Sequence, residues 1–412
     1  CPEDFCLFGS FHIFAVQTFL DTMNCIAKFE EIYRKSPEAV AFCPYRVCPV
    51  GAHSDHQYGK VTGFAIDKGI NIAFSPKYNG VVELASLQFE KRAQWHVRDV
   101  FETRRGDWAD YLRGATIELG AIYPLRNGVS GVIEGSLPIG GLSSSAAVTI
   151  AFISALCKVN DIHLAPLEII EIALRAELNY VGVSVGKLDQ SCEVYSKAGH
   201  LLYLDTLDDS YELIPAPDFM KPWKVGIFFS GLERNLAGSK YNMRVDEVRS
   251  AAYALKAYAG MEYGKFSETY LREVPREIYE AYKERLPYNW CKRAEHWYTE
   301  FDRVERAAEA WRRGDIEEYG RISTESGASS INNWETGSPE LKTLYEVIVR
   351  QDGVYGGRFS GAGFKGCCMA LIDPSYEESI AANVEREYLA VFPQLRGKYL
   401  YCGCNTADGV RL

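Results

Sequence analysis

A glycine-serine segment in the first half of the chain most narrows the folds available to it. Residues 138–146 read PIGGLSSSA, end the strand-like run GVIEGSLP and lead directly into an apolar helical pattern. Adjacent glycines let the backbone approach a ligand closely, and the N–H groups at a helix start attract anions. The segment lacks the Gly-Lys-Ser/Thr ending of a Walker loop. It indicates either a phosphate-binding loop of another type or a loop that only caps a core helix.

Two further stretches have the character of binding sites. Residues 46–59 read RVCPVGAHSDHQYG, so that an apolar strand end gives way to crowded polar residues. Polar groups just past a strand end are typical of a site. Residues 359–366 read FSGAGFKG and form a second glycine cluster towards the other end of the chain. One such loop is weak evidence, but the three stretches together favour a site assembled from distant segments.

Composition excludes several classes of protein. The chain has 412 residues and a formal net charge of −10, which argues against non-specific binding to nucleic acid or to an anionic membrane. No run of eighteen apolar residues is present, so we expect no membrane span. The twelve cysteines form no paired C-x-x-C set, which favours reduced thiols and a cytoplasmic protein. Residues 1–22 lack a basic region and make a poor secretory signal, leaving either a leader or an extension.

The hydrophobic pattern predicts an α+β protein of two domains. We expect an N-terminal domain over residues 23–210 and a C-terminal domain over residues 211–412, because an acidic, proline-bearing stretch lies near residues 206–222. Short strands are expected within residues 61–101, and helices over the ranges 106–123, 164–182, 238–285 and 292–318.

The three stretches resemble, in order, the signature motifs of the GHMP kinases, the superfamily of galactokinase, homoserine, mevalonate and phosphomevalonate kinases. The likeness covers roughly residues 40–375 and is of the galactokinase type, whose signature core Gly-Glu-His-Thr-Asp-Tyr corresponds here to GAHSDH. Other matching segments are Trp108-Ala-Asp-Tyr111, Leu188-Asp189-Gln190 and Ser239-Lys-Tyr241-Asn242. The resemblance implies the two-domain GHMP kinase fold: an N-terminal mixed α/β domain, a C-terminal ferredoxin-like domain, and an active site in the cleft between them.

The resemblance also implies roles for individual residues. Asp189 matches the catalytic aspartate beside the anomeric hydroxyl, and Arg46 matches its partner arginine. Ser145 and Glu177 match the Mg²⁺ ligands. The implied ATP-binding residues are Trp108, Tyr111, Gly140, Gly141, Leu142, Ser143, Ser144, Ser145 and Ala146. The implied substrate-binding residues are Ala52, His53, Asp55 and Tyr241, to which we add Lys365. Taken singly, residues such as Trp108 and Tyr111 are more often core aromatics; Glu177 would be a solvated helix residue and Arg46 a structural ion-pair partner.

Ala52 departs from the galactokinase signature and bears on the substrate. Galactokinases carry there a glutamate whose carboxylate accepts a hydrogen bond from the C6 hydroxyl of the sugar. A buried glutamate would repel a sugar that carries its own carboxylate at C6. The pattern Gly-Ala-His-x-Asp-His-Gln resembles the galacturonokinases, the uronic-acid branch. Other departures are Lys187, Lys240 and Lys365, which add positive charge or are solvated surface lysines, and Asn332-Asn333 in place of an Asp-Asp pair.

Three functions are compatible with these residues. The first is an ATP-dependent, magnesium-using kinase that makes galacturonate 1-phosphate from D-galacturonate. The second is a galactokinase, or another neutral-hexose kinase, that tolerates Ala52. The third is a non-catalytic sugar sensor, against which Arg46, Asp189, Glu177 and the intact glycine-serine segment all argue. We expect no nucleic-acid or membrane partner. The oligomeric state is left open by the sequence, with a monomer favoured.

Overall fold

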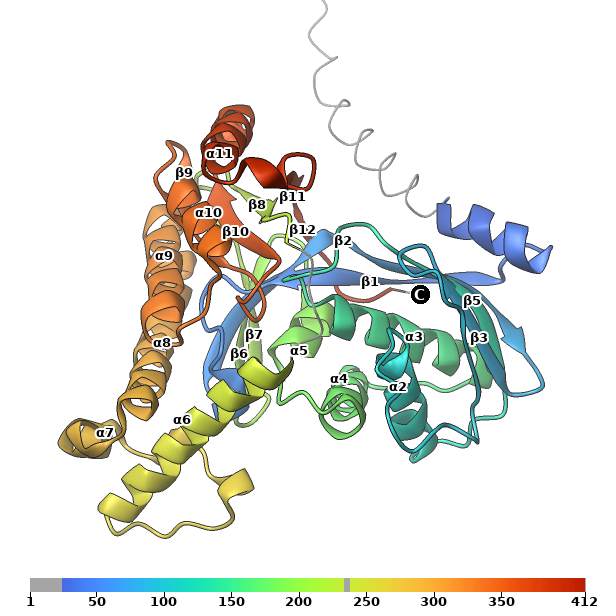
Figure 1. The fold of residues 1–412 in the computed structure, drawn as a ribbon, viewed down its shortest axis with the longest axis horizontal. Helices are drawn as coiled ribbons and strands as arrows, with labels where there is room; N and C mark the ends of the chain where they lie inside the picture. Colours follow the sequence, from blue (N-terminus) through green and yellow to red (C-terminus); the bar gives the residue numbers. More distant parts are fainter. Residues whose placement is uncertain (1–23, 233–237, 412) are drawn as a thin grey trace, which may run out of the picture.

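A mixed sheet of eight strands organises the N-terminal half of the protein (Figure 1). The structure, a computed structural model, describes residues 24–232 and 238–411, so the predicted leader or extension over residues 1–22 lies outside it. The strand order is β4-β3-β5-β2-β6-β7, and β1 and β12 also pair with β2. Only β3 and β5 pair in parallel within this sheet. Its strands are β1 (Ala39–Val47), β2 (Lys60–Lys77), β3 (Val81–Ser86), β4 (Ala93–His96), β5 (Gly128–Gly135), β6 (His200–Asp205), β7 (Tyr211–Pro215) and β12 (Thr406–Ala407).

A register shift near the end of β1 lies at the start of the stretch over residues 46–59. The pairing of β1 with β2 is interrupted between Pro44 and Arg46. Such irregularities bend a strand and re-aim the side chains next to them. Arg46 lies immediately after the shift and is buried. The turn η1 (Asp55–Gln57) lies in the connection from β1 to β2.

Helices cover one face of this sheet, the lower face in Figure 1. They are α2 (Asp110–Gly120), α3 (Ser144–Asn160), α4 (Pro166–Arg175), the π-helical segment η2 (Ala176–Val181) and α5 (Leu188–Tyr195). Helix α3 is apolar almost throughout and packs on β1 and β2, which explains why its sequence shows little amphipathic pattern. A helix over residues 24–33 lies on the opposite face, where Cys25 and Phe29 pack against the sheet. The range 164–182, predicted as one helix, contains α4 followed directly by the π-helical segment η2.

The C-terminal half contains a second, four-stranded antiparallel sheet of order β11-β8-β10-β9. Its strands are β8 (Lys224–Phe229), β9 (Val354–Phe359), β10 (Cys367–Ile372) and β11 (Leu400–Cys404). Helices lie between β8 and β9, and α11 (Glu377–Val391) lies between β10 and β11, flanked by the turns η6 (Pro374–Tyr376) and η7 (Pro393–Leu395). This is the βαββαβ arrangement of ferredoxin-like domains. The expected two-domain architecture is confirmed.

The long helices predicted in the C-terminal half are shorter in the structure. The range 238–285 contains α6 (Gly238–Tyr258), the short turns η3 (Phe266–Glu268) and η4 (Leu271–Glu273), α7 (Arg276–Tyr282) and η5 (Lys283–Arg285). Gly260 takes a left-handed conformation just after α6, and Pro275 precedes α7. Gly314, also left-handed, separates α8 (Tyr288–Arg312) from α9 (Ile316–Asn332). The helix α10 (Pro339–Val349) follows. Amphipathic periodicity continued across these breaks and masked them.

The two halves share a core. The ring of Phe64 in β2 lies 5.2 Å from that of Trp311 in α8, and the Tyr319 hydroxyl lies 3.3 Å from that of Thr62. Strands β7 and β12, which come after residue 210, both belong to the first sheet. Among the described residues, no helix is long and apolar enough to cross a membrane. The ten described cysteines are free thiols.

Candidate active site

Arg46 and Asp189 form the centre of the site. The Nε and Nη2 atoms of Arg46 each lie 2.7 Å from Oδ1 of Asp189, and Nη1 donates to the Gly141 carbonyl at 3.2 Å. Arg46 comes from the end of β1, and Asp189 lies in the first turn of α5. Burial alone would lower the pKa of Arg46, but the charge and hydrogen bond of Asp189 raise it. Arg46 is therefore charged, and Asp189 keeps 23% of its side chain exposed.

The glycine-serine segment closes over this pair. Gly140 and Gly141 have φ angles of +145° and +89°, which side-chain-bearing residues rarely adopt. A Cβ atom on Gly141 would lie 2.7 Å from the Cys367 sulfur and 2.9 Å from the Ser360 carbonyl. The Ser360 hydroxyl donates to the Gly141 carbonyl at 2.6 Å. The two glycine clusters are thus packed against one another, although the sequence separates them widely.

Ser143 links the segment to Asp189. Ser143 is the N-cap residue of α3 and has a left-handed backbone conformation. Its hydroxyl donates to Oδ2 of Asp189 instead of capping the helix. No side chain caps the start of α3, so its first N–H groups keep their capacity to bind an anion. Leu142 and Ala146 are buried, whereas Ser144 and Ser145 are half-buried at this helix end.

Glu177 lies in η2 and is linked to the segment that carries Asp189. Its Oε1 accepts a hydrogen bond from Gln190 at 3.0 Å, and Gln190 directly follows Asp189. Glu177 is buried rather than solvated. A hydroxyl such as that of Ser145 and a carboxylate are hard oxygen donors of the kind Mg²⁺ accepts. The donor set fits a magnesium ion in chemistry.

Trp108 and Tyr111 lie at the start of α2, half-buried. Trp108 precedes the helix and packs partly against the core, and its indole N–H donates to the Lys91 carbonyl at 2.9 Å. Its ring stacks on Phe89 with an interplanar angle of 5°. Phe89 is 41% exposed, so an aromatic pair faces solvent here. Phe89 was not predicted from the sequence, because nothing near it resembled a motif.

The stretch after β1 is held by the helical part of the C-terminal half. Ala52 is buried and belongs to an apolar cluster with Leu188 and Cys192. His296 of α8 lies with Nε2 3.0 Å from the Ala52 carbonyl, and the Gly51 N–H donates to Glu300 at 2.7 Å. Neither contact was predicted, because His296 and Glu300 lie within an ordinary charged helical pattern. Helix periodicity indicates a buried face but not what that face contacts.

His53 and Asp55 both point inward from this stretch. His53 has a φ angle of +65° and stacks on Trp334 with ring centroids 5.1 Å apart. The Asp55 carboxylate accepts a hydrogen bond from the Leu188 N–H at 3.1 Å, which places it beside Asp189. Burial and the Asp189 charge raise the pKa of Asp55 to about 6. Burial lowers the pKa of His53 well below its ordinary value, so its imidazole is neutral.

Tyr241 of α6 completes this group. Its ring centroid lies 6.1 Å from that of His53. Burial, followed by the charges of Asp55 and Asp189, raises its pKa well above the ordinary value, which keeps the phenol protonated. The predicted sugar residues Ala52, His53, Asp55 and Tyr241 therefore come together from two segments, the connection after β1 and helix α6, with Asp55 beside Asp189.

The lysines that depart from the galactokinase pattern, Lys187, Lys240 and Lys365, differ in their surroundings. Lys187 forms ion pairs with Glu171 at 2.7 Å and Asp209 at 2.8 Å, so its charge is neutralised within the fold. The Lys240 side chain lies outside the described part of the protein. Lys365 lies in the second glycine cluster, whose Gly366 is packed against Gly140. Asn333 holds the end of α9 by donating to Ser329 at 3.2 Å.

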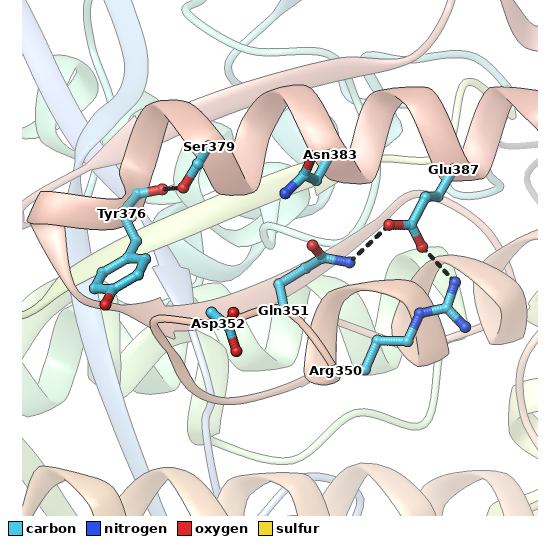
Figure 2. Close-up of a pocket in the computed structure, with 7 residues that line it drawn as sticks. All are labelled: Arg350, Gln351, Asp352, Tyr376, Ser379, Asn383 and Glu387. Carbon is cyan, nitrogen blue, oxygen red and sulfur yellow. Dashed lines mark hydrogen bonds and ion pairs between the residues drawn. The ribbon is translucent and has the colours of Figure 1, made fainter.

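A surface hollow lies away from this site. A depression of about 450 Å³ lies between the end of α10 and the face of α11, and Figure 2 shows its polar lining. Arg350 and Gln351 both contact Glu387 across it. None of the residues predicted for the site lines this hollow.

Known proteins share this architecture. The GHMP kinases N terminal domain model matches residues 110–197, the GHMP kinases C terminal model residues 307–390, and the galactokinase galactose-binding signature residues 27–76. A galacturonokinase of Arabidopsis thaliana is 37% identical over 92% of this chain and 94% of its own length. A galactokinase of Roseiflexus sp. (strain RS-1) is 30% identical over 95% of this chain and 97% of its own length. The crystal structure of Lactococcus lactis galactokinase complexed with galactose superposes with a TM-score of 0.85 at 26% identity, covering 94% of this chain and 98% of that one.

The chain belongs to the GHMP kinases. Within them it is a sugar-1-kinase of the galactokinase and galacturonokinase type. Kinases of this family take ATP as the phosphate donor. The resemblance stated from the sequence is confirmed.

Proposed function

We propose that this enzyme phosphorylates the anomeric hydroxyl of D-galacturonate to give galacturonate 1-phosphate and ADP. The observation that carries the proposal is Ala52, buried where the galactokinase signature has a glutamate. The 37% identity to a galacturonokinase supports it, against about 30% to a galactokinase. A glutamate carboxylate about 4 Å from a C6 carboxylate would cost roughly 1–4 kcal/mol at effective dielectrics of 80 to 20. Alanine removes that repulsion.

Asp189 acts on the sugar hydroxyl. Its Oδ1 receives two N–H groups of Arg46, whereas Oδ2 receives only the Ser143 hydroxyl among the contacts described. We assign Oδ2 as the atom that accepts the proton of the anomeric hydroxyl as this oxygen attacks the γ-phosphate. Arg46 pairs with Asp189 and stabilises negative charge on the transferring group. Proton removal is late in a loose transition state, so positioning and charge stabilisation supply most of the rate.

The phosphates of ATP are held at the start of α3. The N–H groups of this uncapped helix end and the hydroxyls of Ser144 and Ser145 face that position in our assignment. Trp108 and Tyr111 provide the adenine pocket. Ser145 and Glu177 would hold Mg²⁺, which neutralises phosphate charge when bound. Gln190, which directly follows Asp189 in the chain, donates a hydrogen bond to Glu177. This bond fixes the metal ligand Glu177 relative to the catalytic aspartate.

The test is substrate preference. ADP release is measured side by side with galacturonate, glucuronate, galactose and N-acetylgalactosamine, each at several concentrations. We expect kcat/KM to be highest with galacturonate. A preference for galactose would favour the second candidate, galactokinase, which the galactose-complexed structural relative supports. Turnover with none of the sugars, despite ATP binding, would favour a sugar sensor, against which the intact Arg46–Asp189 pair argues.

A further inference from the structure

Buried polar atoms without hydrogen-bond partners concentrate beside Ala52. Among the described residues they include Nε2 of His53, both ring nitrogens of His56 and Nε1 of Trp334. The three side chains are only 5%, 8% and 0% exposed, respectively. More than nine in ten buried polar groups in proteins have a partner, so such a cluster calls for an explanation.

These atoms belong to one group of rings. The Trp334 ring lies 5.1 Å from that of His53 and 5.5 Å from that of His56. It also lies 5.5 Å from His296, whose Nε2 contacts the Ala52 carbonyl. The cluster therefore borders the position where the galactokinase signature places the carboxylate that contacts C6.

The chemistry of the cluster suits an anion. An indole N–H can only donate, and a neutral imidazole offers one N–H. Burial, followed by the positive charge of Arg249, lowers the pKa of His56 to about 3. Burial, followed by the charge of Arg358, likewise lowers the pKa of His53. Glu300, the carboxylate near His296, is engaged by Arg303, Ser326 and the Gly51 N–H. The cluster thus presents donors and a positive field.

We infer that Trp334 and His56 bind the C6 carboxylate of the sugar acid, each donating one hydrogen bond to it. This inference rests on the proposed function and names the residues that make it specific. The galactokinase signature has tyrosine at the position of His56, so the two departures from that signature, Ala52 and His56, act together. Ala52 removes a competing carboxylate, and the donor cluster recognises the substrate's own.

The test compares Trp334→Phe with a matched control. Trp334→Phe keeps an aromatic ring against His53 and removes the N–H. Trp311→Phe removes an indole N–H that donates to the Ile214 carbonyl at 3.0 Å, near the C-terminal end of α8. A hydrogen bond to a charged group is worth roughly a 10- to 150-fold change in binding. We expect Trp334→Phe to raise the KM for galacturonate by about that factor, at least tenfold more than for galactose. Trp311→Phe should affect both sugars equally.

A second pair of variants tests His56. His56→Gln retains a side-chain N–H, whereas His56→Leu has none. We expect His56→Gln to keep more galacturonate selectivity than His56→Leu, with melting temperatures recorded for both. Equal losses on both sugars in Trp334→Phe and in His56→Leu would overturn the inference, while a wild-type preference for galacturonate would leave the proposed function standing. A wild-type enzyme that takes only galactose would overturn both.

Discussion

Arg46 and Asp189 lie 143 residues apart in the chain, yet two guanidinium nitrogens of one sit 2.7 Å from the same carboxylate oxygen of the other. Strand β1 delivers Arg46, and the first turn of α5 delivers Asp189. The Gly141 carbonyl accepts a third N–H of Arg46, so the glycine-serine segment is fastened to the same pair.

Asp189→Asn should abolish most turnover and leave ATP binding intact. The amide keeps the shape but cannot accept the sugar proton or balance Arg46, so we expect a loss of roughly 100- to 10,000-fold in kcat. Turnover and nucleotide affinity are measured on the same preparation. Asp209→Asn, which removes an ion pair with Lys187, is the matched control and should retain activity. A loss of only a few-fold in Asp189→Asn would exclude Asp189 as the catalytic carboxylate.

Glu177→Gln and Ser145→Ala should both raise the Mg²⁺ concentration needed for half-maximal activity. Each change removes one hard oxygen donor or its charge while leaving the adenine pocket untouched. A titration of Mg²⁺ at fixed ATP measures the shift. A nucleotide-bound structure gives the direct check: either side chain more than about 5 Å from the metal would lie beyond water-mediated ligation.

Ala52→Glu should reduce galacturonate phosphorylation by about five- to a thousand-fold, because two carboxylates then face each other. Galactose phosphorylation should fall far less, since the C6 hydroxyl gains an acceptor. Ala52 belongs to a buried apolar cluster, so Ala52→Gln serves as a control of equal size without charge. If the Glu and Gln variants lose galacturonate and galactose activity alike, with lowered melting temperatures, Ala52 has a packing role only.

Lys365→Ala should weaken galacturonate more than galactose and leave the KM for ATP nearly unchanged. Among the described lysines that depart from the galactokinase pattern, Lys187 is already paired with Glu171 and Asp209, whereas no ion pair involves Lys365. Lys187→Ala is therefore the comparison variant. A higher KM for ATP in Lys365→Ala would instead place this lysine at the phosphates, next to Gly140.

Glu193→Gln should stabilise the protein increasingly as the pH rises. Glu193 is fully buried, its two oxygens have no hydrogen-bond partner, and burial followed by the Asp189 charge raises its pKa well above the ordinary value. The unfolded chain releases this proton near pH 4.3, while the folded protein retains it. The contribution of Glu193 to the free energy of unfolding is therefore fully present below that pH and is lost as the pH rises above it. Melting temperatures at pH 4 and pH 8 should show the variant gaining relative to wild type only at pH 8.

Short motifs were enough to predict the family and the two-domain fold. The glycines at 140 and 141, the serines before α3 and the segments around Arg46 and Asp189 resemble the GHMP kinase signatures, and the comparisons confirm that resemblance. Helix boundaries were less predictable. Amphipathic periodicity runs through Gly260 and Gly314, and only the left-handed backbone at those glycines ends the helices.

The tertiary structure decided which residues meet. Lys187 seemed equivalent to Lys365 by charge, but the packing of α4 and the loop after β6 supplies Glu171 and Asp209 to neutralise it. His296 and Trp334 carry no motif, and they reach Ala52 and His53 only because α8 and the end of α9 pack on the turn after β1. Sequence patterns indicate which face of a helix or strand is buried. Which atoms remain without a hydrogen-bond partner depends on contacts between elements, and these arise only when the chain folds.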